Sequence, residues 1–237
     1  MVGSIGLSDG ATVGGDGVRT ADWVVVIPVK RLDAAKSRLR GAVADSRHED
    51  LALAMVRDTV AAVRACPQVG EVLVVTDDRV VAAAVAPLGA RTVPDEPAAG
   101  LNAAVAFGAD RVAGLGRRRA VLAGDLPGLR PEDLAAALRS AASSVPARRR
   151  RFVADAEGTG TVLLTAGAGV PLEPRFGAGS AAAHAASGAV AMTGDWPGLR
   201  HDVDTPADLR TVLALGAGPH TSALLRDLCL TADCPAG

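Results

Sequence analysis

Short apolar runs alternate with amphipathic segments along most of this chain. The run Trp23–Val29 is rich in β-branched residues, which is typical of a strand buried on both faces. Between Glu49 and Cys66 the apolar residues recur at helical spacing, and Pro67 ends the pattern because it cannot continue a helix. The same reasoning predicts strands at 23–29, 71–78, 90–93, 121–123, 152–155 and 162–164, and helices at 49–66, 78–88, 101–113, 131–143, 181–187 and from 205 or 206.

The order of these elements predicts the fold class. Strands and helices alternate at lengths that form βαβ units, so we expect an α/β fold with a mostly parallel sheet and right-handed crossovers. Residues 1–21 are rich in Gly, Ser and Asp without periodicity, and we expect them to form a flexible leader. We expect a single domain over residues 22–230 and a short tail over 231–237.

Composition narrows the class of protein. With 237 residues, of which 49% are hydrophobic and 22% charged, the chain can bury a sizeable core, which excludes an intrinsically disordered protein. The net charge of −1, with three Phe, two Trp and no Tyr, favours neither nucleic acid nor an anionic membrane as a partner. The three cysteines have no zinc-ligand spacing. No apolar run reaches the length of a membrane span, and residues 1–21 contain no apolar segment of the kind found in a signal peptide, so the expected location is the cytoplasm.

Carboxylates lie next to two of the predicted elements, one after a strand and two before the helix that starts at 205 or 206. Asp125 comes just after the apolar run 121–123, and ligands of open α/β sheets bind outside the carboxyl ends of the strands. A carboxylate at that edge can hold a divalent metal ion, but Asp125 could equally cap the helix that starts near Pro131 or form an Asx-turn. Asp202 and Asp204 are two residues apart, so in a strand they would face the same side.

A basic segment follows the first strand. Lys30, Lys36 and Arg38 lie where α/β folds bind phosphate, and their charges could neutralise a triphosphate. The segment is not a Walker A loop, because it lacks the glycines of that motif. A solvated basic loop without a ligand is the alternative interpretation.

Three other segments could bind an anion. Gly-Leu-Asn at 100–102 opens a helix and offers backbone N–H groups and an amide, although Asn102 could simply help to start that helix. Gly-Thr-Gly-Thr at 158–161 offers N–H groups and hydroxyls, and its alternative is a plain β-turn. Glycines precede Ser180, which could also be an ordinary N-cap. We expect His184 to be a packed or solvent-facing residue rather than a catalytic one.

Taken in order, these motifs resemble one family. Ile-Pro-Val-Lys, Lys-Ser-Arg-Leu, Gly-Leu-Asn, Gly-Asp-Leu-Pro, Gly-Thr-Gly-Thr, Phe-Gly-x-x-Ser and Asp-x-Asp-Thr-Pro follow one another within residues 22–215. The set is similar to the phosphoenolpyruvate or 2-phospho-L-lactate guanylyltransferases of deazaflavin coenzyme (factor 420) biosynthesis. This resemblance implies a glycosyltransferase-A-like nucleotidyltransferase fold, with three αβα layers and a mixed, mostly parallel sheet. The Lys/Arg segment replaces the Gly-rich loop that the commoner sugar-phosphate members carry after their first strand.

The resemblance also implies a role for each candidate residue. Mg²⁺ would be held by Asp125 and Asp202, with Asp204 as a near neighbour. The small phosphorylated acid would be bound by Thr161, Gly177 and Ser180, with Thr159 beside them. The nucleotide would be bound by Lys30, Lys36, Arg38 and Asn102. Catalysis would rest on Asp125, Lys30 and Lys36.

The implied reaction condenses GTP with phosphoenolpyruvate and releases pyrophosphate. A phosphate monoester is already a nucleophile, so such an enzyme needs positioning and charge neutralisation rather than a Ser, Cys or His nucleophile. The same reaction with 2-phospho-L-lactate stays open, as do a molybdopterin or sugar-phosphate nucleotidyltransferase and a non-catalytic protein of this fold. GTP and the small acid are the expected partners of a monomer or small homo-oligomer.

Overall fold

A seven-stranded sheet lies at the centre of this computed structural model, which describes residues 21–34, 39, 45–96, 98–112, 116–143 and 149–228. The strands are β1 (Trp23–Pro28), β2 (Val69–Val75), β3 (Arg91–Val93), β4 (Arg118–Leu122), β5 (Arg151–Ala154), β6 (Thr161–Ala166) and β7 (Val190–Ala191). The α-helices are α1 (His48–Ala65), α2 (Arg79–Val85), α3 (Leu101–Arg111), α4 (Pro131–Ser143), α5 (Ser180–Ala186), α6 (Pro197–Arg200), α7 (Pro206–Leu215) and α8 (Pro219–Asp227). Short 3₁₀ helices are η1 (Leu32–Ala34), η3 (Asp45–Arg47) and η4 (Ala86–Leu88).

The sheet is mixed but mostly parallel, as predicted. Its strand order is β3-β2-β1-β4-β6-β5-β7, and β3, β2, β1 and β4 pair in parallel. β6 is antiparallel to both β4 and β5, while β7 pairs in parallel with β5, so β6 alone is reversed among the seven. The carboxyl ends of β1 and β4 therefore lie side by side at one edge, and the loops that follow them meet there.

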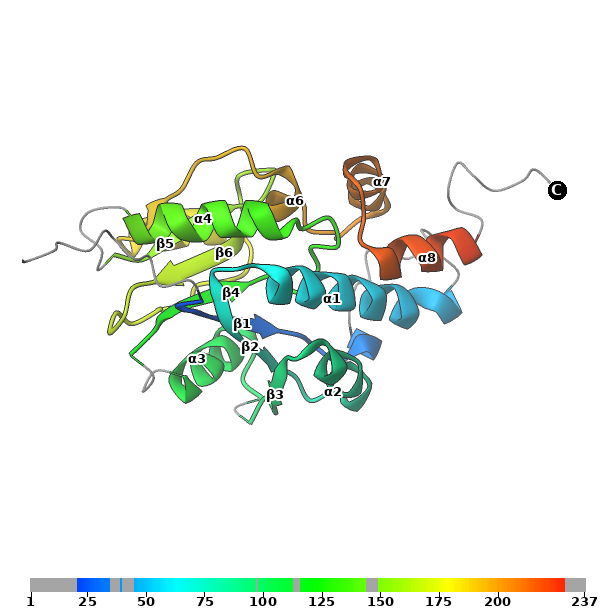
Figure 1. Cartoon of the computed structure of the whole chain (residues 1–237), viewed down its shortest axis with the longest axis horizontal. Helices are drawn as coiled ribbons and strands as arrows, with labels where there is room; N and C mark the ends of the chain where they lie inside the picture. The colour runs from blue at the N-terminus through cyan, green and yellow to red at the C-terminus, as the bar shows by residue number, and fades with distance from the viewer. Residues whose placement is uncertain are drawn as a thin grey trace, which may run out of the picture.

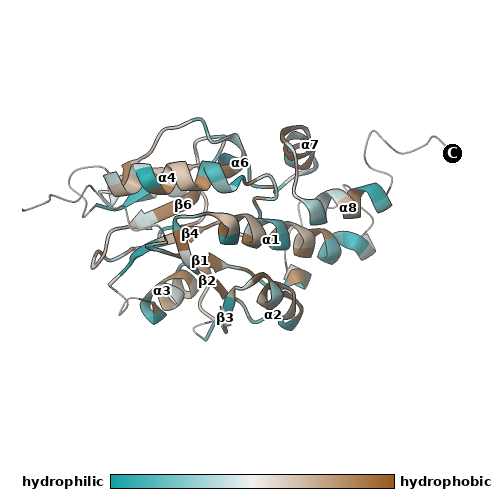
Figure 2. Ribbon diagram, in the orientation of Figure 1, coloured by the Kyte–Doolittle hydropathy of each residue, from teal (hydrophilic) through white to brown (hydrophobic). Residues whose placement is uncertain are grey.

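Helices cover both faces of the sheet, which gives the expected three layers (Figure 1). Trp23, Val25 and Ile27 of β1 pack with apolar residues of α1, α2 and α4 on one face. Val24 and Val26 pack with α3 and α5 on the other. Both faces of β1 are buried, so the continuous apolar run at this position has a physical cause. Figure 2 shows brown strands between helices that carry both colours.

Most predicted elements are confirmed, and two boundaries are corrected. β4 ends at Leu122, one residue before the end expected from the sequence, and Asp125 lies in the loop beyond the strand. The segment of Asp202 and Asp204 is not a strand of the sheet; it is an extended loop ahead of α7. Thr205 starts α7 with a capping box that involves Asp208, as the Thr-Pro pair suggested.

The C-terminal helices pack on α1 rather than on the sheet. Val203, Leu209, Val212 and Leu225 form a separate apolar cluster with residues that include Leu51 of α1. The sequence patterns did not predict α8, which lies beside α1 in Figure 1. This packing holds the loop of Asp202 and Asp204 close to the carboxyl edge of the sheet.

A buried carboxylate on α1 fixes the start of α8. Asp58 accepts hydrogen bonds from the backbone N–H groups of His220 at 3.0 Å and Thr221 at 2.8 Å. Asp58→Ala should lower the free energy of unfolding by about 2 kcal/mol, because these donors at a helix start lose their acceptor. Urea denaturation measures the change. Asp227→Ala, at the exposed end of α8, is the matched control, and equal midpoints for both variants would contradict the assigned role.

Candidate active site

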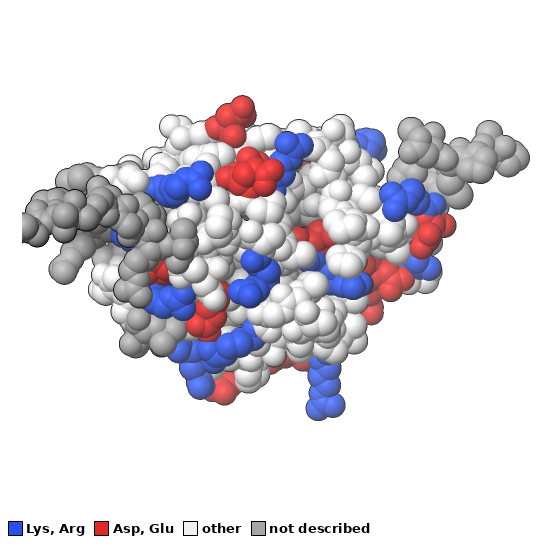
Figure 3. Space-filling view, in the orientation of Figure 1, with Lys and Arg blue, Asp and Glu red and all other residues white. Residues whose placement is uncertain are grey.

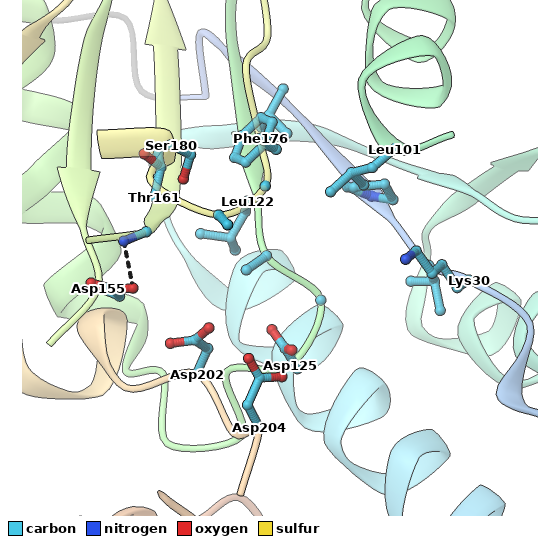
Figure 4. A pocket seen from close by; sticks show the side chains of 18 of the residues that line it. Lys30, Leu101, Leu122, Asp125, Asp155, Thr161, Phe176, Ser180, Asp202 and Asp204 are labelled. Atoms are coloured by element: carbon cyan, nitrogen blue, oxygen red, sulfur yellow. Dashed lines mark hydrogen bonds between the residues drawn. The ribbon is translucent and has the colours of Figure 1, made fainter. Parts of the chain in front are cut away.

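A cavity of about 750 Å³ opens outside the carboxyl ends of β1 and β4 (Figure 4). Segments far apart in the sequence line it, including 28–30, 122–125, 159–161 and 176–180. The predicted site residues that it brings together are Lys30, Asp125, Thr159, Thr161, Gly177, Ser180, Asp202 and Asp204. Lys36 and Arg38 lie outside the described residues. Figure 3 shows acidic and basic side chains interspersed over the face that it displays.

The two acid-bearing segments are joined directly through their backbones. The N–H group of Val203 donates to the carbonyl oxygen of Asp125 at 3.1 Å. Asp202 and Asp204 flank Val203, whose side chain is buried, and Figure 4 shows their carboxylates on the same side of the cavity as that of Asp125. Residues nearly eighty positions apart in the chain thus form one acidic wall.

The loop of Asp125 is also fastened to α1. Thr59 is fully buried, and its hydroxyl accepts the N–H group of Leu126 at 3.0 Å while donating to the carbonyl oxygen of Met55 at 2.9 Å. A threonine in the middle of an amphipathic helix looks unremarkable in the sequence. Its hydroxyl nevertheless positions the residue next to Asp125, and no pattern along the chain indicated this.

The donor set of the acidic wall suits a hard divalent cation. Carboxylate oxygens are the ligands that Mg²⁺ and Ca²⁺ prefer. Within the described part of the chain, no group of three or more His, Cys, Asp or Glu side chains is arranged to hold a metal ion by itself. Mg²⁺ commonly takes only one or two protein carboxylates and completes its shell with water and substrate phosphates. The residues present therefore fit a metal that arrives with a phosphate-bearing substrate.

Lys30, just beyond β1, lies on the side of the cavity away from Thr161 and Ser180, with the acids between the two sides (Figure 4). Asp78 holds the chain that follows: its carboxylate accepts the N–H group of Leu32 at 2.9 Å and caps the start of α2. Burial is the largest single effect on the pKa of Asp78 and raises it. The hydrogen bonds from the N–H groups together lower it by more, so the net pKa lies below its usual value. A charged carboxylate thus anchors the basic segment.

Asn102 supports a loop instead of lining the cavity. Its amide nitrogen donates to the carbonyl oxygen of Phe176 at 3.0 Å, and its oxygen accepts the N–H group of Phe176 at 2.7 Å. Both ends of the side chain are therefore occupied within the protein. Phe176 itself lines the cavity, so the influence of Asn102 on a ligand passes through the loop that it holds.

The Gly-Thr-Gly-Thr loop has an internal acceptor that sequence reasoning missed. The carboxylate of Asp155 accepts the N–H groups of Thr159 at 2.9 Å and Gly160 at 2.7 Å. These are the backbone donors that the motif seemed to offer to an anion. An Asx-turn joins the Asp side chain to a backbone group two residues on, whereas these N–H groups lie four and five residues after Asp155, so that turn signal did not indicate the contact. Thr161 begins β6, and it lines the cavity.

Glycine is required at two positions of the loop ahead of α5. Gly177 has φ 131° and Gly179 has φ 69°, in the region that side chains with a Cβ rarely adopt. Gly179 is the N-cap of α5, so Ser180 is the first residue of the helix and not its cap. Ser180 is 2% exposed and lines the cavity. The loop therefore brings Gly177 and Ser180 to the cavity together.

His184 is a packed residue, as expected, and both of its ring nitrogens have partners. Nδ1 lies 3.0 Å from the hydroxyl oxygen of Thr161, and Nε2 accepts the N–H group of Arg175 at 2.9 Å. The rings of Phe152 and Phe176 flank it. Burial lowers the pKa of His184 to about 4, and the nearby charges of Arg150 and Arg175 add to the effect.

Residues 23–236 match the family described as "Guanylyl transferase CofC like". The phosphoenolpyruvate guanylyltransferase of Salinispora arenicola is 62% identical over 205 residues, which cover 86% of this chain and 94% of that protein. The protein of the same name from Geodermatophilus obscurus is 59% identical, with 86% and 94% covered. That from Streptomyces coelicolor is 51% identical, with 85% and 95% covered.

Solved structures share the fold at low sequence identity. A nucleotidyl transferase from Methanothermobacter superimposes with a TM-score of 0.59 at 21% identity, covering 86% of this chain and 98% of the other. A protein described as a nucleotide-diphospho-sugar transferase from Desulfovibrio desulfuricans G20 gives a TM-score of 0.62 at 15% identity, with 88% and 95% covered. The predicted nucleotidyltransferase type of fold is confirmed. Within the described residues, each helix is too short or too polar to cross a bilayer.

Proposed function

Because the chain belongs to the family of CofC-like guanylyl transferases and is thus a nucleotidyltransferase, we propose that it transfers the guanylyl group of GTP to phosphoenolpyruvate. The product is enolpyruvoyl-2-diphospho-5′-guanosine, which we assign to deazaflavin coenzyme biosynthesis, and pyrophosphate is released. The observation that carries the proposal is the 62% identity, over 86% of this chain, to a phosphoenolpyruvate guanylyltransferase. The cavity adds support, since acids, a lysine and hydroxyls meet there.

The reaction needs no nucleophilic side chain. An oxygen of the phosphoenolpyruvate phosphate attacks the α-phosphorus of GTP, a new P–O bond forms, and the bond from the α-phosphorus to the bridging oxygen breaks. Pyrophosphate takes the electrons of the broken bond. The protein's task is to place the attacking oxygen in line and to neutralise the charges that would otherwise repel one another.

We place the two substrates on opposite sides of the acidic wall. Thr161, Gly177 and Ser180, with Thr159 beside them, would hold the small acid, because a hydroxyl and a glycine backbone can approach carboxylate and phosphate oxygens closely. The nucleotide would lie against Lys30, and its phosphates would extend toward Lys36 and Arg38. Asn102 would act on the site through Phe176, which it holds at both backbone groups.

Nucleotidyltransferases generally use a divalent metal ion, and we propose Mg²⁺ for this one. Asp125 and Asp202 would hold it, with Asp204 as neighbour, and bound Mg²⁺ would supply charge stabilisation for the phosphoryl oxygens. The chain's own contribution is to fix the two acid-bearing loops relative to each other, through Val203 and Thr59.

Pyrophosphate release tests the function. The purified protein is incubated with Mg²⁺ and GTP, and phosphoenolpyruvate and 2-phospho-L-lactate are added in separate reactions. We expect release only when an acid is present, and faster with phosphoenolpyruvate. Preference for 2-phospho-L-lactate would change the substrate and keep the reaction. No release with either acid, including when the downstream acceptor enzyme is present to remove product, would overturn the proposal.

Ser180→Ala tests the acid site. We expect the KM for phosphoenolpyruvate to rise about tenfold, because a hydrogen bond to a charged group is lost, while the KM for GTP changes little. Steady-state kinetics with each substrate varied in turn measures both values. Ser143→Ala, at the exposed end of α4 and outside the cavity lining, is the matched control. A larger rise in the KM for GTP than for the acid would place the acid elsewhere.

A further inference from the structure

The hydrogen bonds of His184 determine where its proton lies. The backbone nitrogen of Arg175 can only donate, so Nε2 of His184, 2.9 Å away, must accept and carries no hydrogen. A neutral imidazole then has its hydrogen on Nδ1. The hydroxyl oxygen of Thr161 lies 3.0 Å from Nδ1, so in this pair the histidine donates and the threonine accepts. The backbone of Ser180 also accepts from the ring and acts to raise its pKa, against the larger effect of burial.

The direction of that bond excludes the orientation in which the Thr161 hydroxyl hydrogen points at His184. A hydroxyl has one hydrogen to donate, and here it cannot point at His184, whose Nδ1 already supplies the shared hydrogen. Thr161 lines the cavity, while His184 is fully buried behind it. The hydroxyl hydrogen is therefore available to a ligand in the cavity, and the ligand atom that it meets must be an acceptor.

The surroundings keep His184 neutral, as this arrangement requires. It lies between the rings of Phe152 and Phe176 with no exposed surface. The charged groups that act on it are Arg150 and Arg175, both cationic, and both oppose a positive imidazole. Arg150 is itself paired with Glu173 at 2.7 Å. An imidazolium would also lose the bond from Arg175, because Nε2 could no longer accept.

We propose that His184 is a positioning residue that orients the Thr161 hydroxyl as a hydrogen-bond donor toward an anionic oxygen of the small acid substrate. The inference rests on the proposed function only for the identity of that acid. The same ring, through Nε2, holds the backbone of the loop that carries Gly177, and Asn102 holds the next residue of this loop from the other side. One buried side chain thus aligns two parts of the acid site.

The tautomer can be measured without turnover. Two-bond ¹H–¹⁵N correlation spectra of uniformly labelled full-length protein report the protonation of each imidazole nitrogen, and His184→Gln identifies its signals among those of the four histidines. We expect a neutral ring with hydrogen on Nδ1 at pH 7. A ring protonated on Nε2, or on both nitrogens, would overturn the proposal whatever reaction the enzyme catalyses.

A double-mutant cycle tests whether His184 acts on binding of the acid through Thr161. Gln can replace Nε2 as an acceptor for Arg175 but cannot donate from the position of Nδ1, whereas Asn can donate there. His184→Gln should raise the KM for phosphoenolpyruvate about tenfold and leave the KM for GTP nearly unchanged. His184→Asn should give a KM between those of the wild type and His184→Gln, because Asn keeps the donor to Thr161 and loses the acceptor for Arg175. In the Thr161→Val background, His184→Gln should add less than about a twofold effect, because the two residues act as one unit.

The outcomes separate the two proposals. If Thr161→Val leaves the KM for phosphoenolpyruvate unchanged, the acid site of the proposed function is wrong, and the functional part of this inference falls with it. If Thr161→Val raises that KM but the effects of the two substitutions are additive, or if His184→Asn is as impaired as His184→Gln, the acid site stands and the role of His184 is overturned.

Discussion

Asp125→Asn should lower kcat/KM by roughly 100- to 1,000-fold, the range seen when one electrostatic group that stabilises a transition state is removed. The substitution keeps the size of the side chain and removes its charge. The backbone carbonyl of Asp125, which accepts the N–H group of Val203, is unaffected, so the two acid-bearing loops should stay joined. The loss should therefore come from weaker binding of the divalent ion and not from a rearranged cavity.

Two measurements separate these causes. Mn²⁺ binding in the presence of GTP, followed by electron paramagnetic resonance, should weaken in Asp125→Asn, while the thermal unfolding midpoint stays close to that of the wild type. Asp110→Asn, on the exposed surface of α3, is the matched control and should behave as the wild type in both. Near-normal turnover in Asp125→Asn would remove this residue from the metal site, and Asp202→Asn would then have to be tested in its place.

The free energy of unfolding should fall by about 3 kcal/mol between pH 6.5 and pH 4 through His184 alone. The pKa of this histidine is lowered from 6.5 to about 4 in the folded protein, mainly by burial. In that range His184 is protonated in the unfolded chain and neutral in the folded protein, so a lower pH favours unfolding. The contribution of His184 is complete above pH 6.5 and is lost progressively as the pH falls toward 4.

A comparison with His184→Gln isolates this effect. Carboxylates also titrate over the same range, but they are common to both proteins and cancel in the difference between them. Urea denaturation at several pH values should show that the wild type loses more stability than the variant as the pH falls. Parallel curves would mean that His184 titrates normally in the folded protein, and would contradict the buried, neutral ring.

Local patterns were sufficient for most of the fold. The β-branched run of β1 and the helical periodicity of α1 each report burial that is decided within a few neighbouring residues. α8 escaped prediction because its position depends on Asp58, more than 160 residues earlier, which caps it. A cap supplied by a distant residue leaves no trace in the sequence around the helix.

The residues of the candidate site also fall into two groups, those that local sequence patterns indicated and those that only the fold reveals. Asp125, Asp202 and Ser180 could be located because a strand end, a helix start and preceding glycines, respectively, mark them in the sequence. The roles of Asp155, Thr59 and His184 depend on hydrogen bonds whose partners are brought together only by the fold, apart from the local loop of Asp155. Asn102 illustrates the limit: its position at a helix start suggested a ligand contact, yet its amide is used by Phe176, which lies 74 residues away.

The backbone hydrogen bond between Asp125 and Val203 affects when activity is gained on folding and lost on heating. During synthesis the strands β1 to β4 and Asp125 leave the ribosome well before the segment of Asp202 and Asp204. That segment reaches its place through α7 and α8, which pack on the outside of α1. Local opening of this outer unit would separate the acids while leaving the sheet intact. Catalytic competence should therefore appear last on folding and disappear first on warming. Activity should be lost at a lower temperature than the spectroscopic signal of the folded sheet.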